Sequence, residues 1–410
     1  MSNEKAVTVG APFPRNYSAE LLTLTRGEGV YLEDSAGTRY LDFGAGIAVN
    51  ALGHGRDDLA EIAAAQMRKV IHVSNLYTTP PALELARRLV SSRVGASEKE
   101  FAAVHFGNSG AEANEAAIKY ARLYALATRG ENHHKVLSLS HGFHGRTMGA
   151  LSATPSIKYQ KKFLPLVPGM EAVPMGDIAA LEETLDATFA AVIVEVVQGE
   201  GGLAVMSREY AELLNRLTAE LDVLLIADEI QTGLSRLGYL YGSELVDLKP
   251  DIVTLSKPLA GGLPLSATLI PEKVNERLEL GDHGTTFGGG PVTTAVAAHV
   301  WDLLSDPAFI ETVREKGEHL GARLKEIAGR HERVGQVRGA GMLRGIEITG
   351  SQEEVATAMS DIMAEARRGG LLILRSGSNV LRLAPPLVIT REEIDRGVEL
   401  LERAVKHVVG

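Results

Sequence analysis

Short apolar segments recur along the middle of the chain, and each is separated from the next by a stretch long enough for a helix. Four such segments cover residues 136–139, 191–195, 223–227 and 252–255. Strands that read as continuous apolar runs are typical of a parallel sheet, because crossover helices cover both of its faces. The spacing therefore predicts an α/β fold with a mostly parallel sheet flanked by helices.

The two ends of the chain differ from this middle part. Residues 30–34 and 38–43 read as two strands joined by a turn at 35–37, which predicts a hairpin. Beyond about residue 306 the sequence predicts charged helices and strand-like segments: helices over 314–331 and 352–368, strands over 341–347 and 380–383. We expect a large domain over 51–306 and a smaller α+β domain built from 1–50 and 307–410.

Composition excludes several classes of function. The 410 residues include no cysteine, so disulfides, thiolate metal sites and thiol nucleophiles are ruled out. The 42 basic and 52 acidic residues give a net charge of -10, and no basic run stands out, which argues against nucleic acid or an anionic membrane as partner. No apolar segment approaches the ~18 residues of a membrane helix. We therefore expect a cytoplasmic protein.

A lysine and an aspartate follow two of the predicted strands. Lys257 ends the run that begins at Asp251 and precedes Pro258, and Asp228 follows the run that ends at Ala227. Such a pair suits pyridoxal phosphate (PLP), because the amine can bind the cofactor's aldehyde and the carboxylate can keep the pyridine nitrogen protonated. Taken alone, either residue could equally be a solvated loop or turn residue.

Two glycine-containing loops could hold the rest of such a cofactor. Ser109 and Glu112 have the spacing of a capping box before an alanine-rich helix, so this site could be a plain helix cap or a phosphate seat. Further on, Phe143 could stack on a pyridine ring and Arg146 could grip a carboxylate. A metal site using the neighbouring histidines lacks a third ligand at suitable spacing.

Two carboxylates and one arginine complete the set of candidates. Glu195 ends a predicted strand, and Glu200 lies in the glycine-rich turn that follows it. Arg382 lies on the opposite face of its strand from Leu381 and Leu383, so its guanidinium faces either a cleft or water.

As a set, these segments resemble the class III, fold-type I, PLP-dependent aminotransferases from about residue 26 to the C-terminus. Six motifs stand in the family's order: 107–112 (GNSGAE), 143–147 (FHGRT), 198–202 (QGEGG), 228–233 (DEIQTG), 255–257 (LSK) and 286–289 (TFGG). The resemblance implies a PLP transferase fold with a large and a small domain. It also implies a homodimer with shared active sites.

The resemblance assigns a role to each candidate. Lys257 would bind PLP covalently and then carry the proton, and Asp228 would pair with the pyridine nitrogen. The remaining cofactor contacts would come from Gln231 at the phenolic oxygen, Phe143 on one ring face, Ser109, Gly110 and Ala111 at the phosphate, and Thr286 reaching the phosphate from the neighbouring subunit.

Within the family the chain is most similar to the acetylornithine and succinylornithine branch, through segments 44–54 and 74–77. This implies transfer of a terminal amino group from an N-acylornithine to 2-oxoglutarate, and a place in arginine biosynthesis. Ornithine aminotransferases carry a tyrosine where Gly46 stands, so ornithine is an alternative donor of lower rank, as is 4-aminobutyrate. We expect Ile47, Asn75 and Tyr77 to form walls of the substrate pocket.

The family further implies a switch between two kinds of substrate. Arg146 would hold the carboxylate far from the reacting amine, and Glu200 would neutralise Arg382 until an α-carboxylate binds there. The glycines beside Glu200 would allow it to swing away. Two residues depart from the usual pattern: Gly290 replaces an asparagine, and Val196 replaces a proline. Other readings are a PLP-dependent aminomutase and a noncatalytic protein that kept the fold.

Overall fold

A mixed sheet of seven strands forms the centre of the molecule. The computed structural model describes residues 14, 16, 22–95 and 97–410. In order across the sheet the strands are β4 (Ala103–Gly107), β10 (Ser266–Ile270), β9 (Ile252–Leu255), β8 (Leu224–Asp228), β7 (Phe189–Val194), β5 (Lys135–Leu139) and β6 (Met170–Val173). Strands β9 to β6 are parallel, and β10 runs antiparallel to both of its neighbours. The predicted, mostly parallel α/β sheet is confirmed.

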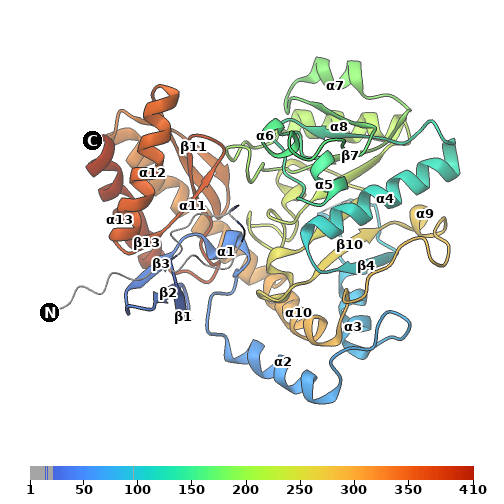
Figure 1. Cartoon of the computed structure of the whole chain (residues 1–410), viewed down its shortest axis with the longest axis horizontal. Coiled ribbons are helices and arrows are strands. Elements are labelled where there is room, and N and C mark those ends of the chain that lie inside the picture. Colours follow the sequence, from blue (N-terminus) through green and yellow to red (C-terminus); the bar gives the residue numbers. More distant parts are fainter. Residues whose placement is uncertain (1–13, 15, 17–21, 96) are drawn as a thin grey trace.

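Helices cover both faces of this sheet (Figure 1). They are α2 (Asp57–Lys69), α3 (Pro80–Val90), α4 (Gly110–Arg129), α5 (Met148–Ser152), α6 (Ile157–Gln160), α7 (Ile178–Thr184), α8 (Arg208–Glu220), α9 (Glu272–Asn275) and α10 (Pro291–Leu304), with short 3-10 turns η1 (Gly242–Val246) and η2 (Lys257–Ala260). Alternate strand residues face opposite layers. Val136, Ile193 and Ile226 pack against α4, whereas Leu137 and Leu225 join the core on the other face.

A second, antiparallel sheet follows in the chain. Its strand order is β11 (Val334–Ala340), β12 (Leu343–Ile348), β15 (Val380–Leu383) and β14 (Leu374–Ser376). Three long helices accompany it: α11 (Pro307–Arg330), α12 (Gln352–Arg368) and α13 (Arg391–Val409). The predicted helix over 352–368 and strand over 380–383 have these same bounds.

The N-terminal strands join this C-terminal part. A third sheet has the order β1 (Leu24–Glu28), β2 (Tyr31–Asp34), β3 (Arg39–Asp42) and β13 (Leu371–Leu372), and the turn α1 (Ala45–Ala48) follows β3. Strands β2 and β3 form the expected hairpin, and β3 pairs in parallel with β13. Figure 1 shows β1 to β3 beside α12 and α13, away from the large sheet. This supports a small domain from 1–50 and 307–410, whose exact boundaries stay a prediction.

Sequence reasoning missed three strands of the large sheet: β4, β6 and β10. Strand β4 contains His105 and a terminal glycine, and neither is favoured in strands. Its place is set by antiparallel pairing with β10 along its whole length, and sequence periodicity does not reveal such pairing. Within the described part of the chain, no helix is long and apolar enough to cross a membrane.

Candidate active site

The sheet brings the candidate residues together because parallel strands end at a common edge. The segments after β5, β7, β8 and β9 meet there, as expected for a ligand site at the carboxyl ends of such strands. A cavity of about 280 Å³ lies at this edge. Its walls include Gly110, Ala111, Phe143, Arg146, Glu195, Glu200, Asp228, Gln231 and Lys257.

Asp228 is one of two buried acids in this cavity, with 4% of its surface exposed. Its Oδ2 accepts a hydrogen bond from Asn114 Nδ2 at 2.8 Å and lies 2.8 Å from His144 Nδ1. Burial opposes protonation of His144, but the hydrogen bond and charge of Asp228 outweigh it and raise the pKa of His144. The Asp228 side chain is therefore held in one orientation.

Lys257 lies beside this carboxylate at the start of η2, where its φ is 36°. Burial is the largest influence on its amine and lowers its pKa, although Asp228 and Glu195 act in the opposite direction. A buried lysine with a lowered pKa supplies more of the neutral amine, which is the nucleophilic form. This side chain can bind a carbonyl carbon and later accept a proton.

Glu195 links two parts of the cavity wall. Its Oε2 accepts a hydrogen bond from the amide of Phe143 at 2.9 Å, and its Oε1 accepts one from Gly199 at 3.2 Å. Burial, followed by the charge of Asp228, raises the pKa of Glu195 to about 7. The residue thus fixes the aromatic wall relative to the loop that carries Glu200.

The N-terminus of α4 forms another wall. Ser109 and Glu112 form the predicted capping box, in which Ser109 Oγ accepts from the Glu112 amide and Glu112 accepts from the amides of Asn108 and Ser109. The amides of Gly110 and Ala111 have no protein acceptor among the described residues. These two free donors at the positive end of a long helix suit an anion.

Arg382 enters the site from β15 and is almost fully buried. Its Nη1 lies 2.7 Å from Glu200 Oε1, 2.7 Å from the carbonyl oxygen of Gly199 and 3.4 Å from Gln231 Oε1. Of the two alternatives left open by the sequence, the guanidinium therefore faces the cleft. Glu200, with 30% of its side chain exposed, neutralises it at the cavity.

Arg146 is presented differently. Its guanidinium carbon lies 3.7 Å from the centre of the Tyr159 ring and 5.5 Å from that of Phe143. Among the described residues no acid forms an ion pair with it. The exposed cation is thus available to a ligand carboxylate.

Two predicted site residues lie elsewhere. Thr286 and Tyr77 line a separate depression together with His72 and Asn75, and Tyr77 is 73% exposed. The side-chain amide of Asn75 donates to the carbonyls of Thr285 and Gly288, which joins the two loops. Neither Thr286 nor Tyr77 reaches the Lys257 cavity of its own chain.

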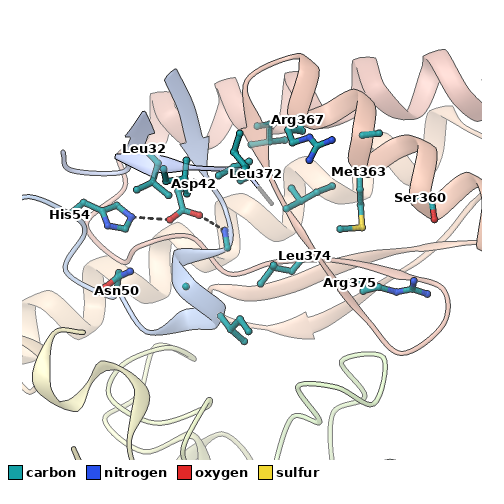
Figure 2. A pocket seen from close by; sticks show the side chains of 18 residues that line it. Leu32, Asp42, Asn50, His54, Ser360, Met363, Arg367, Leu372, Leu374 and Arg375 are labelled. Carbon is teal, nitrogen blue, oxygen red and sulfur yellow. Dashed lines mark hydrogen bonds and ion pairs between the residues drawn. The ribbon is translucent and has the colours of Figure 1, made fainter. Parts of the chain in front are cut away.

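A larger cavity of about 890 Å³ lies between α12 and strands β1 to β3 (Figure 2). Figure 2 shows a mainly aliphatic wall, with His54 Nε2 2.9 Å from Asp42 Oδ2. Asp42 Oδ1 also accepts hydrogen bonds from the amides of Gly44 and Ala45, so both carboxylate oxygens already have protein partners. Gly46 and Ile47 line this cavity and not that of Lys257, so the substrate argument based on Gly46 stays a prediction.

The residues around Lys257 fit PLP. The free amides of Gly110 and Ala111 suit its phosphate, and the fixed Asp228 carboxylate suits a protonated ring nitrogen. Sequence reasoning missed Asn114 and Tyr159. Asn114 is fully buried on the apolar face of α4, and a buried amide on such a face signals a hydrogen-bond partner. Tyr159 gave no sequence signal.

Comparison with known proteins identifies the family of the chain. Residues 13–405 match the family described as aminotransferase class-III. The chain is 42% identical to the probable mitochondrial acetylornithine aminotransferase of Dictyostelium discoideum over 381 residues, which are 92% of this chain and 82% of that protein. It is 40% identical to the acetylornithine aminotransferase of Caldanaerobacter subterraneus, with 96% of each chain covered.

A solved structure shows the same fold. The ornithine aminotransferase of Toxoplasma gondii matches with a TM-score of 0.90 at 30% sequence identity, covering 96% of this chain and 92% of that one. Family model, relatives and fold all point to the same class of protein. The chain belongs to the class III aminotransferases, which are PLP-dependent enzymes.

Proposed function

We propose that the protein is an acetylornithine aminotransferase, which transfers the terminal amino group of N-acetylornithine to 2-oxoglutarate. The observation that carries the proposal is the Arg382–Glu200 pair at 2.7 Å, because it gives the site a cation that can be covered or uncovered. Full-length relatives with this name at about 40% identity support the donor. A place in arginine biosynthesis follows from that substrate.

Each site residue has a task in this proposal. When bound, PLP serves as the electron sink that makes the proton on the amine-bearing carbon acidic. Asp228 would keep the proton on the ring nitrogen, and Lys257 Nζ would take the proton from the amine-bearing carbon of the donor and deliver it to the cofactor carbon that carried the aldehyde. Phe143 would cover one face of the ring, and Gln231 would donate to the phenolic oxygen. The phosphate contacts are Ser109, Gly110 and Ala111.

Selectivity rests on the three charged side chains. Arg146 binds the carboxylate far from the reacting amine in both half-reactions. With the monocarboxylate donor bound, Glu200 neutralises Arg382, so that no buried cation is left unpaired. When glutamate or 2-oxoglutarate binds, the Glu200 side chain leaves and Arg382 takes the α-carboxylate.

The proposal includes a homodimer that shares its active sites. The loop and helix termini around α2, α3 and α10 expose several large apolar side chains: Met67, Ile71, Leu76, Tyr77, Leu83 and Phe287. A patch of this kind indicates a protein interface. Thr286 and Tyr77 lie on it, which supports a contribution of Thr286 to the neighbouring subunit's phosphate site. The cytoplasmic location stays a prediction of the sequence.

Other donors are less well supported. The matched ornithine aminotransferase structure is 30% identical, against about 40% for the acetylornithine relatives. Ornithine has a second free amine, and 4-aminobutyrate has no acylated amine. Both are direct competitors in the test below. An aminomutase would turn over without any 2-oxo acid.

The test is a screen of half-reactions. The PLP-loaded enzyme is mixed with N-acetylornithine, succinylornithine, ornithine or 4-aminobutyrate, and loss of the visible cofactor band is followed by stopped flow. We expect N-acetylornithine to give the highest second-order rate constant for loss of the band, and we expect 2-oxoglutarate to restore the band. Lys257→Ala should abolish both changes. Faster bleaching by ornithine or 4-aminobutyrate would replace the proposed donor, and turnover without a 2-oxo acid would indicate an aminomutase.

A further inference from the structure

The loop that carries Glu200 has a fixed backbone. The amide of Gln198 donates to the carbonyl of Ala204 at 3.0 Å, and the amides of Gly201 and Leu203 both donate to the carbonyl of Gln198 at 3.2 Å. These bonds close a tight turn around Glu200. Main-chain groups paired in this way resist displacement of the loop as a whole.

The glycines beside Glu200 lie in close contact with neighbouring groups. A Cβ on Gly199 would lie 2.4 Å from Gln231 Oε1, and one on Gly201 would lie 2.8 Å from the carbonyl oxygen of His141. Only Gly202 of the three has a positive φ, at 73°. Gly199 and Gly201 are therefore required for close packing, and their part in letting Glu200 swing away stays a prediction.

Ser376, at the end of β14, holds this loop on both sides of Glu200. Its Oγ donates to the carbonyl of Gly199 at 2.7 Å and accepts from the amide of Gly202 at 2.9 Å. The next amide, of Gly377, donates to the carbonyl of Glu200 at 3.0 Å. Ser376 is fully buried, so water does not compete for these bonds.

The same carbonyl orients Arg382. Gly199 O accepts from Ser376 Oγ at 2.7 Å and from Arg382 Nη1 at 2.7 Å. When Glu200 leaves Arg382, this carbonyl remains as a close partner of the guanidinium, with Gln231 next at 3.4 Å. The direction of the Gly199 peptide therefore decides where Arg382 meets an incoming carboxylate.

We propose that Ser376 is a positioning residue for substrate selection. It fixes the Gly199–Gly202 backbone, so the switch is a rotation of the Glu200 side chain alone. Arg382 therefore stays aligned for an α-carboxylate. This inference rests on the proposed function. It predicts that loss of the Ser376 hydroxyl weakens binding of the dicarboxylate substrates and has little effect on the half-reaction with a terminal amine.

The experiment compares Ser376→Ala with Ser378→Ala, which removes an exposed hydroxyl from the same turn. Binding to the PLP-loaded enzyme is measured by calorimetry with glutarate, an unreactive dicarboxylate, and with pentanoate, which lacks the second carboxylate. We expect Ser376→Ala to weaken glutarate binding about fivefold, the worth of one hydrogen bond, and to leave pentanoate binding within twofold. The KM for 2-oxoglutarate should rise by the same factor, with little change in kcat or in the terminal-amine half-reaction. Ser378→Ala should match the wild type in all of these.

Two results would overturn the inference: unchanged glutarate binding in Ser376→Ala, or equal weakening of both ligands together with a lower Tm, which indicates a merely structural role. If Ser376→Ala does not fold, Ser376→Cys keeps the shape with a weaker donor, and the same selective loss, smaller in size, is required. A wild-type enzyme that transfers no terminal amine would instead contradict the proposed function.

Discussion

Arg146 is held by two aromatic rings, and no acid in the described part of the chain pairs with it. The Tyr159 ring, at 3.7 Å, is the closer of the two, and the Phe143 ring meets Tyr159 edge to face at 6.2 Å between ring centres. A cation on an aromatic face keeps its N–H groups free for a carboxylate, because the ring occupies only the flat side. Tyr159 thereby connects the predicted cofactor wall to the predicted carboxylate site.

Replacing Tyr159 tests this arrangement. We expect Tyr159→Leu to raise the KM of the amino donor about fivefold, because a cation–π contact of roughly 1 kcal/mol no longer orients Arg146. The value of kcat should change much less, since the leucine leaves Lys257 and Asp228 untouched. Steady-state kinetics with the best donor from the screen provides the measurement.

Tyr159→Phe is the matched control, because it keeps the ring and removes only a hydroxyl. It should retain a wild-type KM. A KM that rises equally in both variants would show that the hydroxyl, and not the ring face, is what matters.

At the scale of elements, β4 and α4 pack through an aromatic cluster. His105 on β4 lies 5.8 Å from the Tyr120 ring of α4 and 4.6 Å from the His283 ring. Burial, followed by the positive charges of His283 and Lys119, lowers the pKa of His105 to about 4, and Glu112 opposes this only weakly. The histidine is therefore neutral in the folded protein near pH 7.

This packing makes stability depend on pH. The unfolded chain protonates His105 below its ordinary pKa of 6.5, whereas the folded chain does so only near 4. The unfolded state thus binds more protons within this window, and the contribution of His105 to stability is lost as pH falls from 6.5 to 4. We expect a loss of up to about 3 kcal/mol in the free energy of unfolding. Urea denaturation of wild type and His105→Gln at several pH values measures it.

The variant cannot protonate, so its stability should fall less steeply with acidification than that of the wild type. His407→Gln, an exposed histidine on α13, should keep the wild-type slope. Parallel curves for wild type and His105→Gln would contradict the assignment.

At the scale of the whole molecule, an apolar patch lies on α2, α3 and the loop before α10. Leu76 is 87% exposed, Tyr77 73% and Phe287 67%, and the His72 and Phe287 rings lie 5.5 Å apart. Figure 1 places α2, α3 and α10 together at one end of the large domain. Burial of one Leu or Phe side chain contributes roughly 1.5–3 kcal/mol, so a second copy has much to gain here.

Leu76→Asp should weaken the proposed dimer, because association would bury a carboxylate. Sedimentation velocity at micromolar concentration is expected to show a shift toward monomer. PLP binding should weaken in parallel, because Thr286 of one subunit would no longer reach the other's phosphate site. Leu126→Asp places the same charge on an exposed position of α4 and should change neither property. A monomeric Leu76→Asp protein with full PLP affinity would refute shared sites.

The local sequence determined four of the seven strands of the large sheet, the start of α4 and the kind of chemistry. Apolar runs of four to five residues predicted β5, β7, β8 and β9, and the Ser109–Glu112 spacing predicted the start of α4, because strand burial and helix capping depend on near neighbours. Lys257 and Asp228 were recognisable because each follows such a strand. Their family then implied PLP.

Only the tertiary structure decided which polar groups meet. The partners of Asp228 lie 84 and 114 positions away in the chain, and Ser376 lies 177 positions from Gly199. Such contacts depend on strand order and on how the small sheet docks at the edge of the large one. Local periodicity contains no information on either. The sequence by itself therefore named the reacting groups, whereas the fold determined which backbone and side-chain contacts hold them in place.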